Sequence, residues 1–246
     1  NAAIHPDDLQ PWLAAVRAQM RSSEVALRMS IRIRHAAGRW VWIMFVGAVV
    51  DRSASGQALR MAGVALDVQA QKAMEHELRV AARTDGLTQL PNRSVLLHAI
   101  EQAVARGRAQ PGYQFAVLFM DFDRFKQVND TMGHAAGDAL LRGIAAVLTA
   151  ALRGGDTVAR LGGDEFAVLL PACPAPAAQA IAEKLRSVVE AYRLEWEGCT
   201  HQVGASIGLV AVNGLHGSAS QVLRAADAAC YDAKRGGRNR VALATA

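Results

Sequence analysis

Two pairs of acidic residues follow apolar runs that have the composition of buried strands. Asp121 and Asp123 come directly after the run QFAVLFM, and Asp164 and Glu165 follow two glycines between two further apolar runs. Carboxylates next to a buried strand are costly unless water, a counter-charge or a cation stabilises them. If the two strands are neighbours, up to four carboxylates converge, and their repulsion favours a hard divalent cation such as Mg²⁺. On spacing alone, the alternative is that these acidic residues are ordinary solvated turn residues.

Residues suited to a nucleotide occur near these acidic pairs. Asn129 and Asp138 offer the groups that can bind a guanine edge, since a carboxylate accepts from the N1–H and the exocyclic amine. Lys126, Lys234 and Arg238 are cations of the kind that bind phosphates. Each also has an ordinary structural interpretation, as a surface lysine, a helix cap or a charge near a helix dipole. The interpretation as a nucleotide site therefore depends on the occurrence of these residues together with the carboxylates.

Helices and strands alternate along the part of the chain that must position these residues. Apolar periodicity predicts helices at 94–106, 137–152, 177–192 and 220–234, and strands at 114–120, 157–161, 166–170, 203–212 and 240–243. The two glycines between 161 and 166 predict a hairpin. Residues 85–246 are therefore expected to form an α/β (α+β) domain with a central sheet flanked by helices.

Residues 1–68 have a different pattern. Strand-like runs at 30–34, 40–50 and 60–68 are separated by the turn sequences HAAG and SASG, which predicts a three-stranded meander. Residues 69–84 predict a linking helix with one narrow apolar stripe, formed by Ala70, Met74, Leu78 and Ala81. Such a stripe packs either on its own domain or in a short parallel coiled coil between two subunits.

Composition limits the class of protein. The 246 residues are 52% hydrophobic and 20% charged with a net charge of +5, which is ordinary globular composition and excludes a disordered chain. Three distant cysteines argue against a disulfide framework or structural zinc, and no apolar run is long enough to span a membrane. No targeting segment opens the chain, so a cytoplasmic protein is expected. The low aromatic content, 5%, without a basic stripe disfavours nucleic-acid binding.

Five sequence blocks resemble the GGDEF family of diguanylate cyclases. RLGGDEF at 160–166 carries the family signature, and three further blocks are DFDRFKQVND at 121–130, GH with GD at 133–138, and YDAKRGGRN at 231–239. Residues 85–93 resemble the opening segment, with Gln89 where glycine is usual. The resemblance implies a fold like the palm of nucleotide polymerases and condensation of two GTP into cyclic di-GMP and two pyrophosphates. The alternative is a catalytically silent cyclic di-GMP receptor.

The same resemblance implies roles for individual residues. The implied ligands of Mg²⁺, with Mn²⁺ as an alternative ion, are Asp121, the carbonyl of Phe122, Asp164 and Glu165. The implied substrate-binding residues are Asn129, Asp138 and His134 for guanine, and Phe125, Lys126, Lys234 and Arg238 for the triphosphate. The implied catalytic residues are Asp164, Glu165 and Lys126, with either Glu165 or a metal-bound water taking the proton.

Two further expectations concern regulation and assembly. Arg153 and Asp156 match an R-x-x-D site at which many family members bind their own product, and Lys184 and Arg186 are candidates for a contact from a neighbouring subunit. Residues 1–68 resemble, more weakly, the C-terminal part of a PAS sensory domain, followed by a linker helix at 69–84 and the cyclase domain at 85–246. Because each cyclase domain holds one GTP, the resemblance implies an active homodimer.

Overall fold

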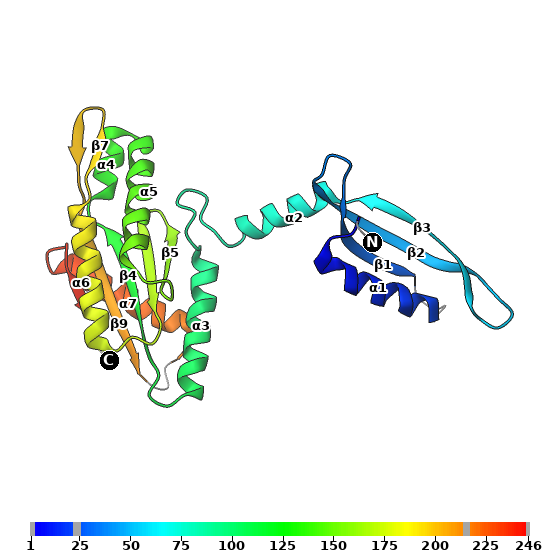
Figure 1. The fold of residues 1–246 in the computed structure, drawn as a ribbon. Helices are drawn as coiled ribbons and strands as arrows, with labels where there is room; N and C mark the ends of the chain where they lie inside the picture. The colour runs from blue at the N-terminus through cyan, green and yellow to red at the C-terminus, as the bar shows by residue number, and fades with distance from the viewer. Residues whose placement is uncertain (1–2, 22–25, 214–216, 245–246) are drawn as a thin grey trace. The chain divides into compact units, whose positions relative to one another are not determined.

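The computed structural model describes residues 3–21, 26–213 and 217–244 (Figure 1). They fall into two compact units, Asn1–Val80 and Ala81–Ala246. Within the described ranges, no helix combines the length and apolar character needed to cross a membrane.

Unit 1 is built on an antiparallel meander, which confirms the predicted strands. Its elements are α1 (Pro6–Arg21), β1 (Leu27–Arg34), β2 (Trp40–Arg52), β3 (Ala58–Asp67) and nearly all of α2 (Gln69–Ala81). Strand β2 pairs with both β1 and β3. Gly38 and Gly56 lie in the connecting turns with a φ of +81°, a left-handed conformation that favours glycine.

Helix α1 was not predicted. Pro6 starts the helix and Asp7 and Asp8 lie in its first turn, where proline and acidic residues favour a helix N-terminus. The Arg32 guanidinium donates to the two carboxylate oxygens of Asp8 at 2.7 and 2.9 Å, which fastens α1 to β1. These hydrogen bonds hold the pKa of Asp8 below its usual range. The internal Pro11 and the many polar residues obscured the helical period in the sequence.

Unit 2 is an α/β domain around a mixed sheet, which confirms the predicted class. Its elements are α3 (Arg93–Ala109), β4 (Gln114–Phe122), α4 (Phe125–Met132), α5 (His134–Ala151), β5 (Thr157–Gly162), β6 (Glu165–Leu170), α6 (Ala175–Ala191), β7 (Leu194–Trp196), β8 (Cys199–His201), β9 (Ala205–Asn213), α7 (Ala219–Arg235) and β10 (Val241–Leu243). The main sheet has the order β10-β9-β4-β6-β5, in which only β10 and β9 are parallel neighbours among the described strands.

Helices cover both faces of this sheet (Figure 1). On one face, Ile144 of α5 and Leu185 of α6 belong to the same buried cluster as Leu118 of β4. On the other face, Ile100 of α3 shares a second cluster with Val117 of β4. Successive residues of a strand point to opposite faces, so β4 contributes to both clusters. A strand buried on both sides appears in the sequence as a continuous apolar run, which is why β4 was predicted readily.

Short elements of unit 2 were missed. Helix α4 has eight residues and β7 and β8 have three each, so none extends over enough turns or alternations to give a clear period. Helix α5 also begins at His134, before the predicted Gly137. The corrections at α4 and at the start of α5 concern the segment that follows β4, where polar residues outnumber apolar ones.

Helix α7 lies very close to β9 at Gly208. A Cβ atom on Gly208 would collide with the carbonyl oxygen of Ala226 and the amide nitrogen of Cys230. The φ of Gly208 is not in the left-handed region, so glycine is needed here for the close approach of two backbones. This contact fixes the depth at which α7 lies on the sheet.

Candidate active site

The β4–β6 pairing brings the two acidic segments together. Asp121 of β4 lies directly opposite Glu165 of β6 in the antiparallel register. Asp164 precedes Glu165 at the tip of the β5–β6 hairpin, and both are partly buried. Three carboxylates therefore share one end of the sheet.

Negative charge accumulates around these carboxylates. Burial raises the pKa of Asp121, the Lys234 ammonium opposes that rise, and the charge of Asp164 adds to it. Burial also raises the pKa of Glu165, and the charges of Asp227 and Asp121 raise it further. A bound cation would relieve this repulsion, because an opposite charge favours the ionised form of a carboxylate.

Lys234 supplies the positive charge in this group. Its Nζ lies 2.6 Å from Asp121 Oδ2, and its side chain is 34% exposed. One turn earlier on α7, the Cys230 thiol donates to the carbonyl oxygen of Ser206 at 3.1 Å. Burial, together with the charge of Asp121, raises the pKa of Cys230 to about 12, so this thiol stays protonated at neutral pH.

Asp227 is a member of the site that sequence reasoning missed. It lies two turns before Lys234 on the same face of α7, and after burial it is the largest contributor to the raised pKa of Glu165. The sequence could have indicated this role only through the two-turn spacing that places Asp227 on the same helix face as Lys234.

The second aspartate of the Asp-Phe-Asp segment has a separate role. Asp123 is 8% exposed, and its carboxylate accepts from Ser206 Oγ at 2.7 Å and from the Asn239 backbone N–H at 2.8 Å. These partners satisfy the buried carboxylate. Asp123 thus fastens β4 to β9 and to the loop after α7, while its charge also contributes to the raised pKa of Asp121.

Arg160 stabilises the hairpin tip from β5. Its NH1 atom lies 2.9 and 3.1 Å from the two carboxylate oxygens of Asp85, and its Nε donates to the carbonyl oxygen of Gly163 at 2.9 Å. Asp85 also accepts from the backbone N–H and the hydroxyl of Thr88. Burial opposes ionisation of Asp85, but these hydrogen bonds and the Arg160 charge hold its pKa below the usual range.

The turn at Gln89 forms despite the missing glycine. Gln89 has a φ of +60°, which explains why glycine is the usual residue at this position. Its backbone N–H donates to the carbonyl oxygen of Asp85 at 2.9 Å, and its Nε2 donates to that of Gly86 at 3.0 Å. Local hydrogen bonds therefore hold a conformation that a non-glycine residue rarely adopts.

The residues expected to bind guanine lie on two consecutive helices. Asn129 is on α4, and His134 and Asp138 are on α5. Asn129 and Asp138 are partly buried, and His134 is exposed. A Cβ atom on Gly137 would collide with Asn129 Oδ1, so the absence of a side chain at Gly137 leaves room for the Asn129 amide.

The residues expected to bind phosphates lie at two helix ends. Phe125 and Lys126 form the start of α4, where backbone N–H groups have no partner within the helix. Lys234 and Arg238 lie at the end of α7, where Gly237 N–H donates to Lys234 O and Arg238 N–H to Ala233 O. This hydrogen-bond pattern is that of a Schellman motif, with Gly237 as its left-handed residue at a φ of +118°.

Arg153 and Asp156 are bound to each other at the opposite end of β5 from the hairpin tip. Arg153 Nε lies 3.0 Å from Asp156 Oδ1, and its NH2 donates to the carbonyl oxygen of Pro171 at 2.7 Å. The Asp156 side chain is 2% exposed and that of Arg153 is 58% exposed. The arginine is therefore the accessible member of this pair.

The two cations on α6 also have partners within the chain. Lys184 Nζ donates to the carbonyl oxygen of Ala151 at 2.6 Å. Arg186 donates to Glu183, Glu190 and Asn239 at 2.8, 2.7 and 3.2 Å. Their expected contact with a neighbouring subunit stays a prediction, and Arg186 would have to leave these partners to make it.

The donor set at the hairpin tip fits a hard cation. All of its candidate ligands are oxygens, and burial, with added repulsion from neighbouring carboxylates, raises the pKa of Asp121 and Glu165. Across the described part of the chain, no three His, Cys, Asp or Glu side chains come close enough to hold a metal on their own. A magnesium ion at the hairpin tip would therefore need substrate phosphate oxygens in addition to the protein's own oxygen ligands.

Comparisons with known proteins match both units. Residues 82–240 match the family described as "Diguanylate cyclase, GGDEF domain", and residues 1–65 match "PAS fold". The chain is 41% identical over 203 residues to the probable diguanylate cyclase DgcE of Escherichia coli, covering 80% of this chain and 17% of that protein. It is 42% identical over 166 residues to the diguanylate cyclase DgcP of Pseudomonas aeruginosa, covering 68% of this chain and 24% of that protein.

Solved structures show the same fold. The coiled coil and GGDEF domain of DgcB from Caulobacter crescentus, in complex with c-di-GMP, is 32% identical with a TM-score of 0.66, covering 72% of this chain and 93% of that one. The GGDEF domain of YfiN (TpbB) from Pseudomonas aeruginosa is 39% identical with a TM-score of 0.63, covering 66% and 95%.

Proposed function

Because the chain belongs to the GGDEF family of diguanylate cyclases, we propose that it condenses two GTP molecules into cyclic di-GMP and two pyrophosphates. The observation that carries the proposal is the in-register placement of Asp121 opposite Glu165, with Lys234 Nζ 2.6 Å from Asp121. In each of the two steps, the 3′-hydroxyl oxygen of one GTP attacks the α-phosphorus of the other. The P–O bond to pyrophosphate breaks, and the hydroxyl proton is released to a base.

The direct test is synthesis by the purified chain. We expect GTP and Mg²⁺ to yield cyclic di-GMP and pyrophosphate, separated by chromatography, with chelation of the metal stopping the reaction. Folded chain at high concentration that makes no cyclic di-GMP, yet binds it, would contradict the proposal and identify a receptor.

Asp121, the Phe122 carbonyl, Asp164 and Glu165 are the proposed ligands of Mg²⁺, and Mn²⁺ has similar preferences for oxygen donors. When bound, the ion lowers the pKa of the attacking hydroxyl and neutralises charge on the phosphates. Lys234 would then exchange its contact with Asp121 for a phosphate oxygen. That exchange keeps the local charge balanced, because the substrate brings negative charge as the ion brings positive charge.

The remaining proposed substrate contacts come from residues of α4 and α5 and from the end of α7. Asn129, His134 and Asp138 are proposed to bind guanine, since amide and carboxylate groups complement its edge. The start of α4, with Phe125 and Lys126, suits phosphate, because helix N-termini carry partial positive charge. Arg238 can bind two phosphate oxygens through its fork of donors.

Substitution of Gly137 tests the guanine site. Gly137→Ala is expected to weaken GTP binding about tenfold, the effect of losing roughly 1.4 kcal/mol, because the new Cβ displaces the Asn129 amide. Alanine is otherwise a better helix former, so the variant should not unfold. Calorimetric titration with GTP measures the effect.

Gly143→Ala is the matched control on the same helix. Its new Cβ would collide with the Tyr192 hydroxyl, away from the guanine residues. It should lower the melting temperature and leave the GTP dissociation constant within about twofold. Equal loss of GTP affinity in both variants would attribute the effect to α5 as a whole.

Dimerisation is proposed to bring two GTP-loaded domains face to face. We propose a sensory part at 1–68, a signalling helix at 69–84 and a cyclase domain at 85–246. Met74 of the apolar stripe is 64% exposed, which leaves it available to a second copy. The side chains of Leu78 and Ala81, also in that stripe, lie outside the described residues. A helix this short is marginal alone, so we expect activity per subunit to rise with protein concentration.

Product inhibition is proposed to act through Arg153, the exposed partner of Asp156. Arg153→Ala is expected to relieve inhibition by cyclic di-GMP and leave the initial rate nearly unchanged, because the residue lies at the other end of β5 from the hairpin tip. Progress curves with added product measure this. Arg142→Ala, an exposed arginine on α5, is the control. Equal inhibition of Arg153→Ala and the parent, or inhibition that GTP overcomes completely, would contradict the proposal.

A further inference from the structure

The loop that carries Arg238 has an unusual backbone. Gly237, Arg238 and Asn239 have φ values of +118°, +65° and +44°. Residues with a side chain rarely adopt this region, and two in succession persist only where surrounding contacts fix them. The Schellman motif accounts for Gly237, so Arg238 and Asn239 need a further cause.

Buried polar contacts hold the Asn239 backbone. Its N–H donates to Asp123 Oδ2 at 2.8 Å, and the other oxygen of Asp123 accepts from Ser206 at 2.7 Å. Asp123 and Ser206 are 8% and 0% exposed. A buried carboxylate with both oxygens occupied has little freedom to move, so the Asn239 backbone is tied to the ends of β4 and β9.

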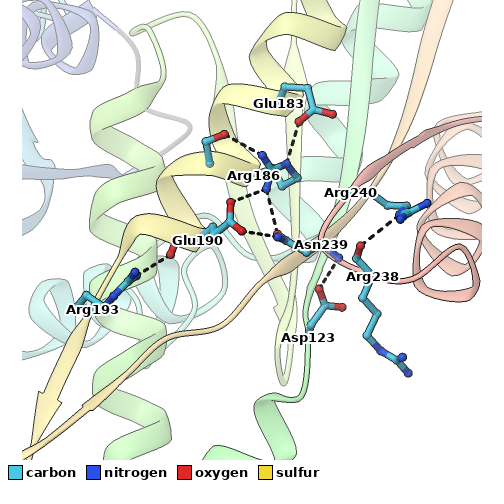
Figure 2. A network of polar contacts seen from close by, with 9 residues as sticks. Asp123, Glu183, Arg186, Glu190, Arg193, Arg238, Asn239 and Arg240 are labelled. Atoms are coloured by element: carbon cyan, nitrogen blue, oxygen red, sulfur yellow. Dashed lines mark hydrogen bonds and ion pairs between the residues drawn. The ribbon is translucent and has the colours of Figure 1, made fainter.

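The Asn239 side chain is held from helix α6 (Figure 2). Asn239 Nδ2 donates to Glu190 Oε1 at 2.6 Å, and Arg186 NH1 donates to Asn239 Oδ1 at 3.2 Å. Arg186 NH1 also lies 2.7 Å from Glu190 Oε2. Both ends of the amide are thus bound by residues that also bind each other, which fixes the amide orientation.

Gly204 leaves room for this arrangement. A Cβ atom on Gly204 would lie 2.9 Å from Asp123 Oδ2 and 3.0 Å from the Cβ of Asn239. The φ of Gly204 is not in the left-handed region, so its lack of a side chain serves the contact between Asp123 and Asn239.

Arg238 extends beyond these contacts. Figure 2 shows its guanidinium on the far side of the loop from Arg186 and Glu190. No described residue forms a hydrogen bond or ion pair with that guanidinium. The network therefore fixes the backbone of a residue whose charged end is left for a ligand.

We propose that Asn239, held by Asp123, Glu190 and Arg186, is a positioning residue that presents Arg238 to the β- and γ-phosphates of GTP. The inference rests on the proposed function, which supplies GTP as the substrate. An arginine on a fixed backbone loses less conformational entropy when it binds, so the network favours triphosphate binding without touching the substrate.

The test compares two ligands that differ only in the phosphates that Arg238 would bind. Asn239→Ala is expected to raise the dissociation constant for GTP about tenfold and that for GMP less than twofold, measured by titration calorimetry with Mg²⁺. Arg238→Ala should show the same selective loss, and adding Asn239→Ala to it should produce no further change. If Asn239 contributed only to stability, its replacement would weaken the binding of both ligands alike.

Glu183→Gln is the matched control, because Glu183 binds Arg186 on the same helix without contacting Asn239. It should change neither dissociation constant by more than about twofold. Gly204→Ala is a second variant that presses on Asp123 and Asn239 without removing a polar group, and it should reproduce the selective loss of GTP affinity. Circular dichroism verifies that each variant is folded.

The outcomes separate this inference from the proposed function. In one outcome, the parent protein binds GTP more tightly than GMP but makes no cyclic di-GMP. If Asn239→Ala then weakens the binding of GTP and not that of GMP, the result supports the inference and contradicts the proposed catalysis. Cyclic di-GMP synthesis by the parent, with Asn239→Ala weakening GTP and GMP equally or weakening neither, overturns the inference alone. An additive effect of Asn239→Ala and Arg238→Ala also overturns it.

Discussion

Replacing Glu165 with glutamine is expected to reduce cyclic di-GMP synthesis by about 10³-fold or more. Losses of this order follow when a group that stabilises charge in the transition state is removed. Glu165 lies opposite Asp121 in the sheet, and its carboxylate is among the proposed ligands of the cation. Glutamine has nearly the same shape but no charge, so the variant isolates the electrostatic contribution. Initial rates over a range of Mg²⁺ concentrations measure it.

The same variant should be at least as stable as the parent. The pKa of Glu165 is raised by burial and by the charges of Asp227, Asp121 and Asp164, so its ionised form is unfavourable in the folded protein. Removing that charge relieves the repulsion, and the melting temperature in the absence of Mg²⁺ should stay constant or rise. A variant that keeps more than a tenth of the parent rate would contradict the proposed role of Glu165.

Asp227→Asn provides a comparison that keeps the hairpin tip intact. Since the charge of Asp227 raises the pKa of Glu165, its removal lowers that pKa. The acid limb of the pH–rate profile should therefore move to lower pH, with activity retained at neutral pH. An acid limb at an unchanged pH would indicate that a group other than Glu165 limits the rate there.

Replacing Arg160 with alanine is expected to destabilise unit 2 by about 2–3 kcal/mol at pH 7. The Asp85 side chain is 20% exposed, and the substitution leaves its charge without the arginine that contacts both of its oxygens. The tip also loses the hydrogen bond to Gly163 O, so cyclase activity should fall as well. Urea denaturation measures the stability change, and Arg142→Ala, an exposed arginine on α5, is its control.

The loss of stability should depend on pH in a defined direction. The pKa of Asp85 in the folded protein lies below the usual range of an aspartate, because Thr88 and Arg160 bind its carboxylate. Its contribution to stability is therefore complete above about pH 4 and is lost as the pH falls through the folded pKa. The difference between parent and Arg160→Ala should be constant from pH 7 to pH 5 and should shrink below pH 4. A difference that grows toward low pH would contradict this account of the ion pair.

The central elements of unit 2 were predictable because their buried residues form continuous apolar runs in the sequence. Strands β4 and β6 are buried on both faces, and the two glycines between β5 and β6 mark the hairpin. Helices α1 and α4 and the β7–β8 hairpin gave no such signal, since α1 is polar with an internal Pro11 and the others are short. Local pattern detects elements only when burial is regular over several turns or alternations.

The site was predictable where residues adjacent in sequence act together, and not where tertiary contacts join distant segments. Asp121 and Glu165 follow from two motifs and one strand pairing. The contact of Asp123 with Asn239, and of Asn239 with Glu190, joins β4, the loop after α7 and α6. No residue spacing in the sequence predicts these contacts, because they depend on how the helices pack on the sheet.

The close packing of Gly208 against α7 has a consequence for how sequence variation in this domain is interpreted. Any side chain there would push α7 outward and move Lys234 away from Asp121, although Gly208 itself has no functional group. Intolerance to substitution at this position would thus resemble that of a reactive residue. A ranking of positions by mutational tolerance would place a structural spacer among the chemical groups, and only the geometry tells the two apart.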